Sequence, residues 1–134
     1  MKAFRITVLI WALLPLVTGL VDVLVGPSAW QGIGANLSER DFVDPVLDSQ
    51  VRFVGLIWFG YGALLCFCLQ DLQKYARLLR AALLLVFMGG IARLLSIFLV
   101  GMPDSGAGQG FIIFALVIEL VLMPALLWWQ SKLT

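Results

Sequence analysis

Four long apolar runs occupy most of the chain and leave few ways for it to fold. They cover residues 4–25, 45–69, 78–100 and 111–129, and the second run opens with polar turns. Each has the roughly 20 residues that an α-helix needs to cross a hydrocarbon core about 30 Å thick. Only 13% of the 134 residues are charged, about half the share in a soluble domain. The sequence predicts an all-α, integral membrane four-helix bundle that forms one domain, 1–134.

The first apolar run has two basic residues at its start, Lys2 and Arg5, as the core of a signal peptide would. It is longer than such a core, which has roughly 7–15 residues, and no clear small-x-small cleavage site follows it. We therefore expect the run to be retained as the first transmembrane helix.

The basic residues of the connections indicate the orientation of the bundle. Six of them flank the N-terminus, the second connection and the C-terminus: Lys2, Arg5, Lys74, Arg77, Arg80 and Lys132. The other two connections contain Arg40 as their only basic residue. Because basic loops stay in the cytoplasm, we expect both termini on the cytoplasmic side of a multi-pass membrane protein.

Several site classes find no support in the sequence. Histidine, the commonest metal ligand, is absent. The net charge of +1 gives no electrostatic reason to expect nucleic acid as a partner. The two cysteines, Cys66 and Cys68, point in different directions on a helix, so we interpret them as packing residues. We predict no metal site, no cofactor and no catalytic residue.

Charged side chains inside the apolar runs are the strongest functional signal. An Arg or Asp at the centre of a transmembrane helix costs roughly 2.5–3.5 kcal/mol, and such groups usually face the bundle interior and pair. Arg93 precedes Gly101 by about 12 Å of helix, and Glu119 follows Gly110 by about 13 Å. The third and fourth helices are antiparallel neighbours, so the two charges fall at one level. The sequence predicts an Arg93–Glu119 ion pair.

Three further charges approach from the same, outer side. Asp22 lies one turn before the end of the first helix, and Asp48 and Arg52 share one face of the second helix at spacing i, i+4. Thr18 lies one turn before Asp22. Ser96 lies on the same stripe of the third helix as Arg93. We expect a polar network, open towards the outside, with these members: Thr18, Asp22, Asp48, Arg52, Arg93, Ser96 and Glu119.

Small residues and prolines indicate how the helices pack. Gly55, Gly62 and Gly89 lie on stripes where helices can approach closely. Pro15 and Pro124 each remove a backbone donor and can kink a helix. Because the carbonyl that loses its donor to Pro124 belongs to Leu120, we expect a kink that aims the Glu119 carboxylate inward.

Four spaced motifs, from the second helix to the fourth, resemble those of a known family. They are D-S-x-x-R-x-x-G at 48–55, G-G-x-x-R-x-x-S at 89–96, G-x-P at 101–103 and E-x-x-x-x-P at 119–124. The resemblance is to a domain-of-unknown-function family of small bacterial four-helix inner-membrane proteins, and it covers nearly the whole chain. It implies the bacterial inner (cytoplasmic) membrane as the location and the following typical positions: Asp48, Arg52, Arg93, Ser96, Glu119 and Pro124.

We favour a non-enzymatic membrane protein whose polar pocket binds a lipid or small amphiphile, or which acts as an accessory subunit. Arg52 and Arg93 would meet the headgroup, because the guanidinium fork suits carboxylate and phosphate. Three alternatives stay open. They are a small proton- or cation-coupled transporter that uses Glu119, a membrane enzyme with carboxylate acid–base chemistry, and a charge network that only fixes helix pairing. The bilayer is the expected partner, and a homo-oligomer or a membrane-protein partner also stays open.

Overall fold

Four long helical segments make up the structure, a computed structural model that describes residues 1–134. They are α1 (Lys2–Val25), α3 (Pro45–Cys68), α4 (Ala76–Val100) and a fourth segment composed of α5 (Gly106–Val117), the π-helical η2 (Ile118–Leu122) and α6 (Met123–Ser131). There are no strands, and each segment is long and apolar enough to cross a membrane. The predicted all-α bundle of four helices suited to spanning a membrane is confirmed.

The longest polar connection, between α1 and α3, contains two short helices, α2 (Pro27–Gly32) and η1 (Asp41–Val43). The α3 helix begins at Pro45, directly after Asp44. The Asp44 carboxylate accepts a hydrogen bond of 2.7 Å from the backbone N–H of Leu47, and proline occupies the first helical position. This side-chain cap satisfies one of the free N–H groups at the helix start.

The fourth segment begins earlier than its apolar run. Residues 104–110 contain three glycines and read as a flexible loop, but α5 already starts at Gly106. The Ser105 hydroxyl accepts a hydrogen bond of 3.1 Å from the N–H of Gly108, and the Gln109 side chain donates to the carbonyl of Pro103 at 3.0 Å. These two bonds hold a glycine-rich turn in helical form.

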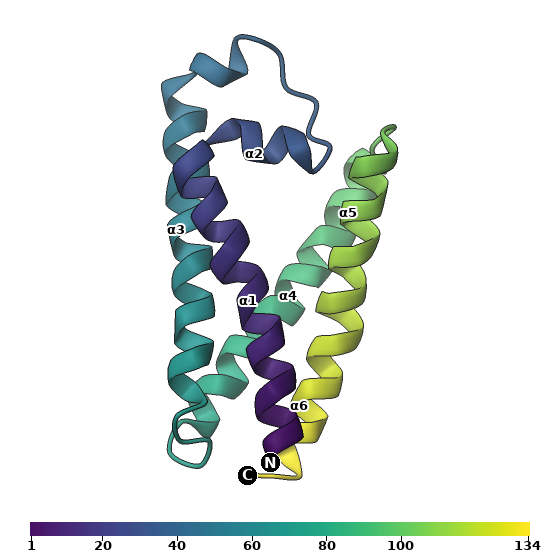
Figure 1. Cartoon of the computed structure of the whole chain (residues 1–134). Coiled ribbons are helices and arrows are strands. Elements are labelled where there is room, and N and C mark those ends of the chain that lie inside the picture. Colours follow the sequence, from purple (N-terminus) through teal and green to yellow (C-terminus); the bar gives the residue numbers. More distant parts are fainter.

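The helices form two antiparallel pairs that meet at one end and separate towards the other (Figure 1). One pair is α1 with α3, and the other is α4 with the fourth segment. Both chain termini lie at the end where the pairs meet, which we call the terminal end. The α2 helix lies across the opposite end, which we call the α2 end. The bundle is therefore closed at the terminal end and spread apart below α2.

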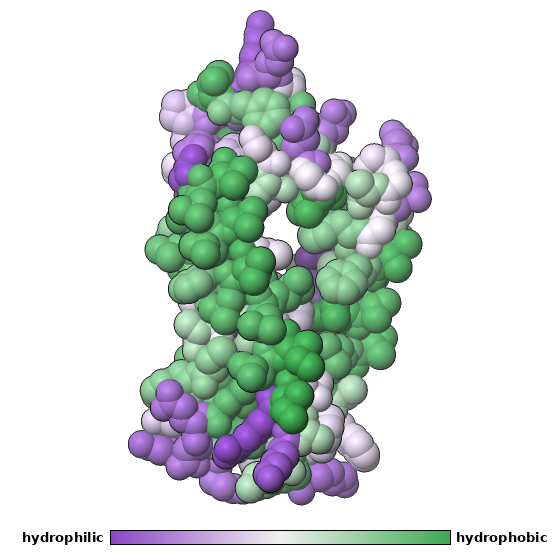
Figure 2. All heavy atoms as spheres, viewed as in Figure 1, coloured by the Kyte–Doolittle hydropathy of each residue, from purple (hydrophilic) through white to green (hydrophobic).

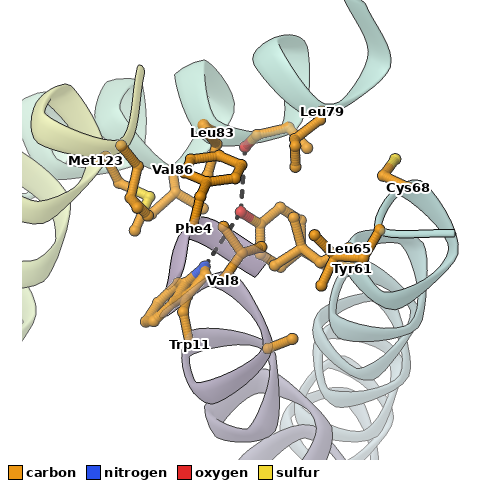
Figure 3. Packing of buried hydrophobic residues seen from close by; sticks show 14 of the residues in the cluster. Phe4, Val8, Trp11, Tyr61, Leu65, Cys68, Leu79, Leu83, Val86 and Met123 are labelled. Carbon is orange, nitrogen blue, oxygen red and sulfur yellow. Dashed lines mark hydrogen bonds between the residues drawn. The ribbon is translucent and has the colours of Figure 1, made fainter. Parts of the chain in front are cut away.

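The buried hydrophobic core occupies the terminal half of the bundle (Figure 3). It includes side chains from α1, α3, α4 and α6, among them Phe4, Leu65, Leu83 and Met123, which are fully buried. The Tyr61 hydroxyl donates to the carbonyl of Ala82 at 3.2 Å, which joins α3 to α4. This core holds the two helix pairs together at one end only.

Glycines permit the closest helix contacts. A Cβ atom at Gly55 would lie 2.6 Å from Cβ of Asp22, and one at Gly62 would lie 2.8 Å from Cγ of Leu16, so both glycines let α3 approach α1. Gly89, which we expected to pack in the same way, has open space around it. Its neighbour Gly90 makes the close contact between α4 and the fourth segment instead.

Candidate functional site

A cavity of about 830 Å³ lies between the two helix pairs where they separate. It is lined by 21 residues from α1, α2, α3, α4, α5 and η2, and 16 of them are hydrophobic. Figure 2 shows the cavity as a hollow that opens sideways between α1 and α5, below α2. Its volume and apolar walls are those of sites that take small organic ligands, which usually measure about 300–1,000 Å³.

Aromatic residues form the floor of this cavity, next to the core. The Trp58 and Tyr61 rings stack with their centroids 5.2 Å apart, and Trp11 meets Trp58 edge to face. The Trp58 indole N–H donates to the Thr18 hydroxyl at 2.9 Å, and this hydroxyl donates to the carbonyl of Leu14 at 2.8 Å. Thr18 therefore orients the Trp58 ring, and both hydrogen bonds of its hydroxyl are made within the protein.

Arg93 and Glu119 face each other across the wall formed by α4 and the fourth segment. Arg93 Nε donates to Glu119 Oε2 at 2.9 Å, and Arg93 Nη2 donates to Glu119 Oε1 at 2.8 Å, so the two side chains form a bidentate ion pair. The Glu119 side chain is 12% exposed and the Arg93 side chain 30% exposed, so the arginine remains accessible from the cavity. The Phe111 ring lies 5.4 Å from the guanidinium carbon and covers it.

Two backbone features hold Glu119 in this place. The segment η2 is a turn of π-helix in which the N–H of Met123 donates to the carbonyl of Ile118. Pro124 has no N–H to give to the carbonyl of Leu120, which favours such a widened turn. A Cβ atom at Gly90 would lie 2.7 Å from Cβ of Glu119. Glu119 thus packs directly against α4 at Gly90, which has no side chain.

Asp22 lines the cavity from α1 and belongs to neither ion pair of the structure. The indole of Trp30 approaches its carboxylate from α2. The cavity is therefore lined by two carboxylates and one guanidinium. With all three ionised, it has one negative charge in excess.

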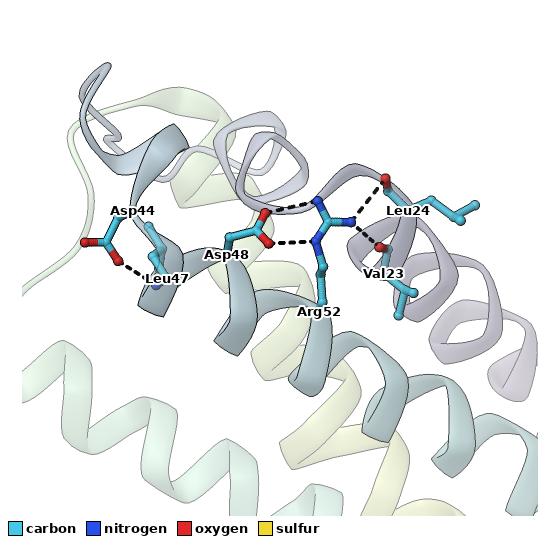
Figure 4. A network of polar contacts seen from close by, with 6 residues as sticks. All are labelled: Val23, Leu24, Asp44, Leu47, Asp48 and Arg52. Atoms are coloured by element: carbon cyan, nitrogen blue, oxygen red, sulfur yellow. Dashed lines mark hydrogen bonds and ion pairs between the residues drawn. The ribbon is translucent and has the colours of Figure 1, made fainter.

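The Asp48–Arg52 pair lies outside the cavity (Figure 4). Arg52 Nε and Nη2 donate to the Asp48 carboxylate at 2.8 and 3.0 Å, and Nη1 donates to the carbonyl of Val23 at 2.6 Å. The side chains are 42% and 37% exposed for Arg52 and Asp48. Because a cation near a helix C-terminus satisfies free carbonyls and the helix dipole, this pair caps α1.

The structure thus divides the predicted polar network into two parts. Thr18, Asp22, Arg93 and Glu119 line the cavity, whereas Asp48, Arg52 and Ser96 do not. The spacing of Asp48 and Arg52 placed them on one face, but it could not indicate that Arg52 turns towards the end of α1. We did not identify Trp30 or Phe111 as cavity residues. Trp30 could have been identified from the sequence, because a tryptophan is unusual in an otherwise polar connection.

The α2 helix closes the cavity at the α2 end. Ala29, Trp30 and Ile33 line it from above. Gly34, at φ +97°, then contacts the backbone of Gly108 at the start of α5. This contact joins the connection after α1 to the other helix pair.

No curated protein and no solved structure is similar to this chain. One family of proteins matches residues 3–130, a range that includes every residue lining the cavity. This match agrees with the resemblance to a family of unknown function. The chain belongs to the family described as Domain of unknown function (DUF4345).

Proposed function

We propose that this protein is a non-enzymatic protein of the bacterial inner membrane that binds one lipid or similar amphiphile in its lateral cavity. The observation that carries the proposal is the combination of an apolar cavity of about 830 Å³, a sideways opening and a charged group within it. A helix bundle in a membrane presents such an opening to hydrocarbon, so a ligand with an acyl chain can enter without crossing water.

The walls suit the two parts of an amphiphile. Hydrophobic side chains from α3, α4 and α5 offer van der Waals contact along a hydrocarbon chain, worth about 0.1–0.2 kcal/mol for each pair of touching atoms. The Arg93–Glu119 pair uses two of the five N–H groups of the guanidinium. The other groups remain for a phosphate, carboxylate or ester oxygen of the headgroup. The sequence suggested both Arg52 and Arg93 as headgroup contacts. Only Arg93 lines the cavity, so we propose Arg93 alone.

The basic residues support the orientation. Lys74, Arg77, Arg80 and Lys132 belong to the terminal end, where Figure 2 displays a hydrophilic band. The positive-inside rule assigns this end to the cytoplasm. The cavity then lies in the half of the membrane that faces the periplasm.

The proposal is tested by identifying what copurifies with the protein. We would remove the cavity pair without leaving a lone charge, in the double variant Arg93→Gln/Glu119→Gln. The matched control is Asp48→Asn/Arg52→Gln, which removes the pair outside the cavity. Mass spectrometry of extracts from equal amounts of folded protein should find an amphiphile in wild type and control and less of it in the cavity variant. Equal amounts in all three proteins would refute the proposal.

A further inference from the structure

Asp22 is the charged cavity residue that the protein itself leaves without a cation. The three charged groups that line the cavity are Asp22, Arg93 and Glu119, and the last two bond to each other. Arg52, the other arginine near the end of α1, is engaged by Asp48 and by backbone carbonyls. No basic side chain forms an ion pair with Asp22.

A lone carboxylate inside a membrane-spanning segment is unfavourable, and such groups usually pair or face the interior of the bundle. Asp22 does the second: it faces the space in which a ligand would lie. The excess of one negative charge in this cavity would be balanced by a ligand that carries a positive group. A purely anionic ligand would increase the imbalance.

The surroundings of Asp22 fit a positive group of one kind. The Trp30 indole approaches the carboxylate from α2, and Trp58 and Tyr61 line the same cavity. Aromatic faces attract ammonium groups, and a carboxylate among aromatic rings is a usual arrangement for amines and quaternary ammonium ions. Arg93, on the opposite wall, retains N–H groups for an anionic or ester oxygen of the same molecule.

We propose that Asp22 binds an amine or quaternary ammonium group of the ligand, so that the cavity selects cationic or zwitterionic amphiphiles over purely anionic ones. This inference rests on the proposed function, since it specifies the ligand class of the same cavity. Asp22 fixes the positive group near α2, and the hydrocarbon chain then lies along the apolar walls towards the lateral opening.

The test compares two probes with equal hydrocarbon chains, dodecyltrimethylammonium and dodecanoate, on the full chain in a neutral maltoside detergent. Wild type should bind the ammonium probe about tenfold more tightly or better, which is the low end of the coupling found for close charge pairs. Asp22→Asn, nearly equal in shape, should reduce this ratio to about one. Asp48→Asn removes an acid outside the cavity and should leave the ratio unchanged.

The outcomes separate the two proposals. Equal binding of both probes by wild type, or tighter binding of dodecanoate, would overturn the role of Asp22 and needs no variant to fold. An equal loss of preference in Asp22→Asn and Asp48→Asn would overturn it as well. If neither probe binds, and nothing copurifies with wild type, the cavity itself is not a ligand site and the proposed function fails.

Discussion

A leucine at position 89 provides the most direct test of ligand binding in the cavity. Gly89 lines the cavity, and a Cβ atom there would meet nothing within 4 Å. Helical side chains lean towards the N-terminus of their helix, so the new side chain would extend towards Val86 and away from Arg93. Gly89→Leu should therefore leave the fold and the ion pair intact while it fills space on the cavity wall.

The size of the effect follows from the hydrocarbon contact that is lost. We expect the leucine to displace about two to three methylene groups of a bound chain, and the several atom contacts that each group loses, at about 0.1–0.2 kcal/mol for each pair, sum to about 2 kcal/mol. This corresponds to a roughly 30-fold increase in Kd. The increase should be similar for probes with different headgroups, because the contact that is lost is with the chain.

Gly60→Leu is the matched control. Gly60 lies in α3, has open space around it and does not line the cavity. Both variants replace a mid-helix glycine by leucine, so both gain similar helix propensity, under about 1 kcal/mol. The Kd of dodecylphosphocholine, measured by titration in neutral detergent, should rise for Gly89→Leu and remain at the wild-type value for Gly60→Leu. Wild-type affinity in Gly89→Leu would show that the ligand binds elsewhere.

Two further variants test the supports of the site. Gly90→Ala places a Cβ atom 2.7 Å from Cβ of Glu119, and we expect this overpacking to cost about 1–3 kcal/mol of stability; a thermal midpoint equal to that of Gly60→Ala would contradict the contact. Arg52→Ala removes the cap on α1 but no cavity residue. It should lower the free energy of unfolding by about 1 kcal/mol, since the pair is well exposed. The amount of copurified amphiphile should remain unchanged. Loss of the amphiphile in this variant would contradict our conclusion that Arg52 lies outside the binding site.

The sequence predicts the helices because each apolar run has the length of a membrane span, and helix geometry alone places Arg93 and Glu119 at the same depth. It does not predict how the helix pairs separate. Apolar side chains that face lipid and those that face a neighbouring helix have the same composition, so the sequence contains little signal for which faces meet. The prediction of the packing glycine illustrates the limit: Gly89 and Gly90 differ by one position, and only Gly90 contacts the fourth segment.

The partners of Arg52 illustrate a second limit. Its position relative to Asp48 follows from helix spacing, but its bonds to Val23 and Leu24 depend on where α1 ends beside α3. That position is set by tertiary packing at Gly19 and Gly55, where the two backbones approach. The helical start of α5 was missed for a related reason, since a single serine cap outweighs the flexibility of three glycines.

The contact between Gly34 and Gly108 means that the two helix pairs are fastened at both ends of the molecule, by side-chain packing at one end and by backbone at the other. An amphiphile bound as we propose would occupy a space that the folded helices already enclose. Under the proposed function, the cost of ordering the binding space would then be met during folding.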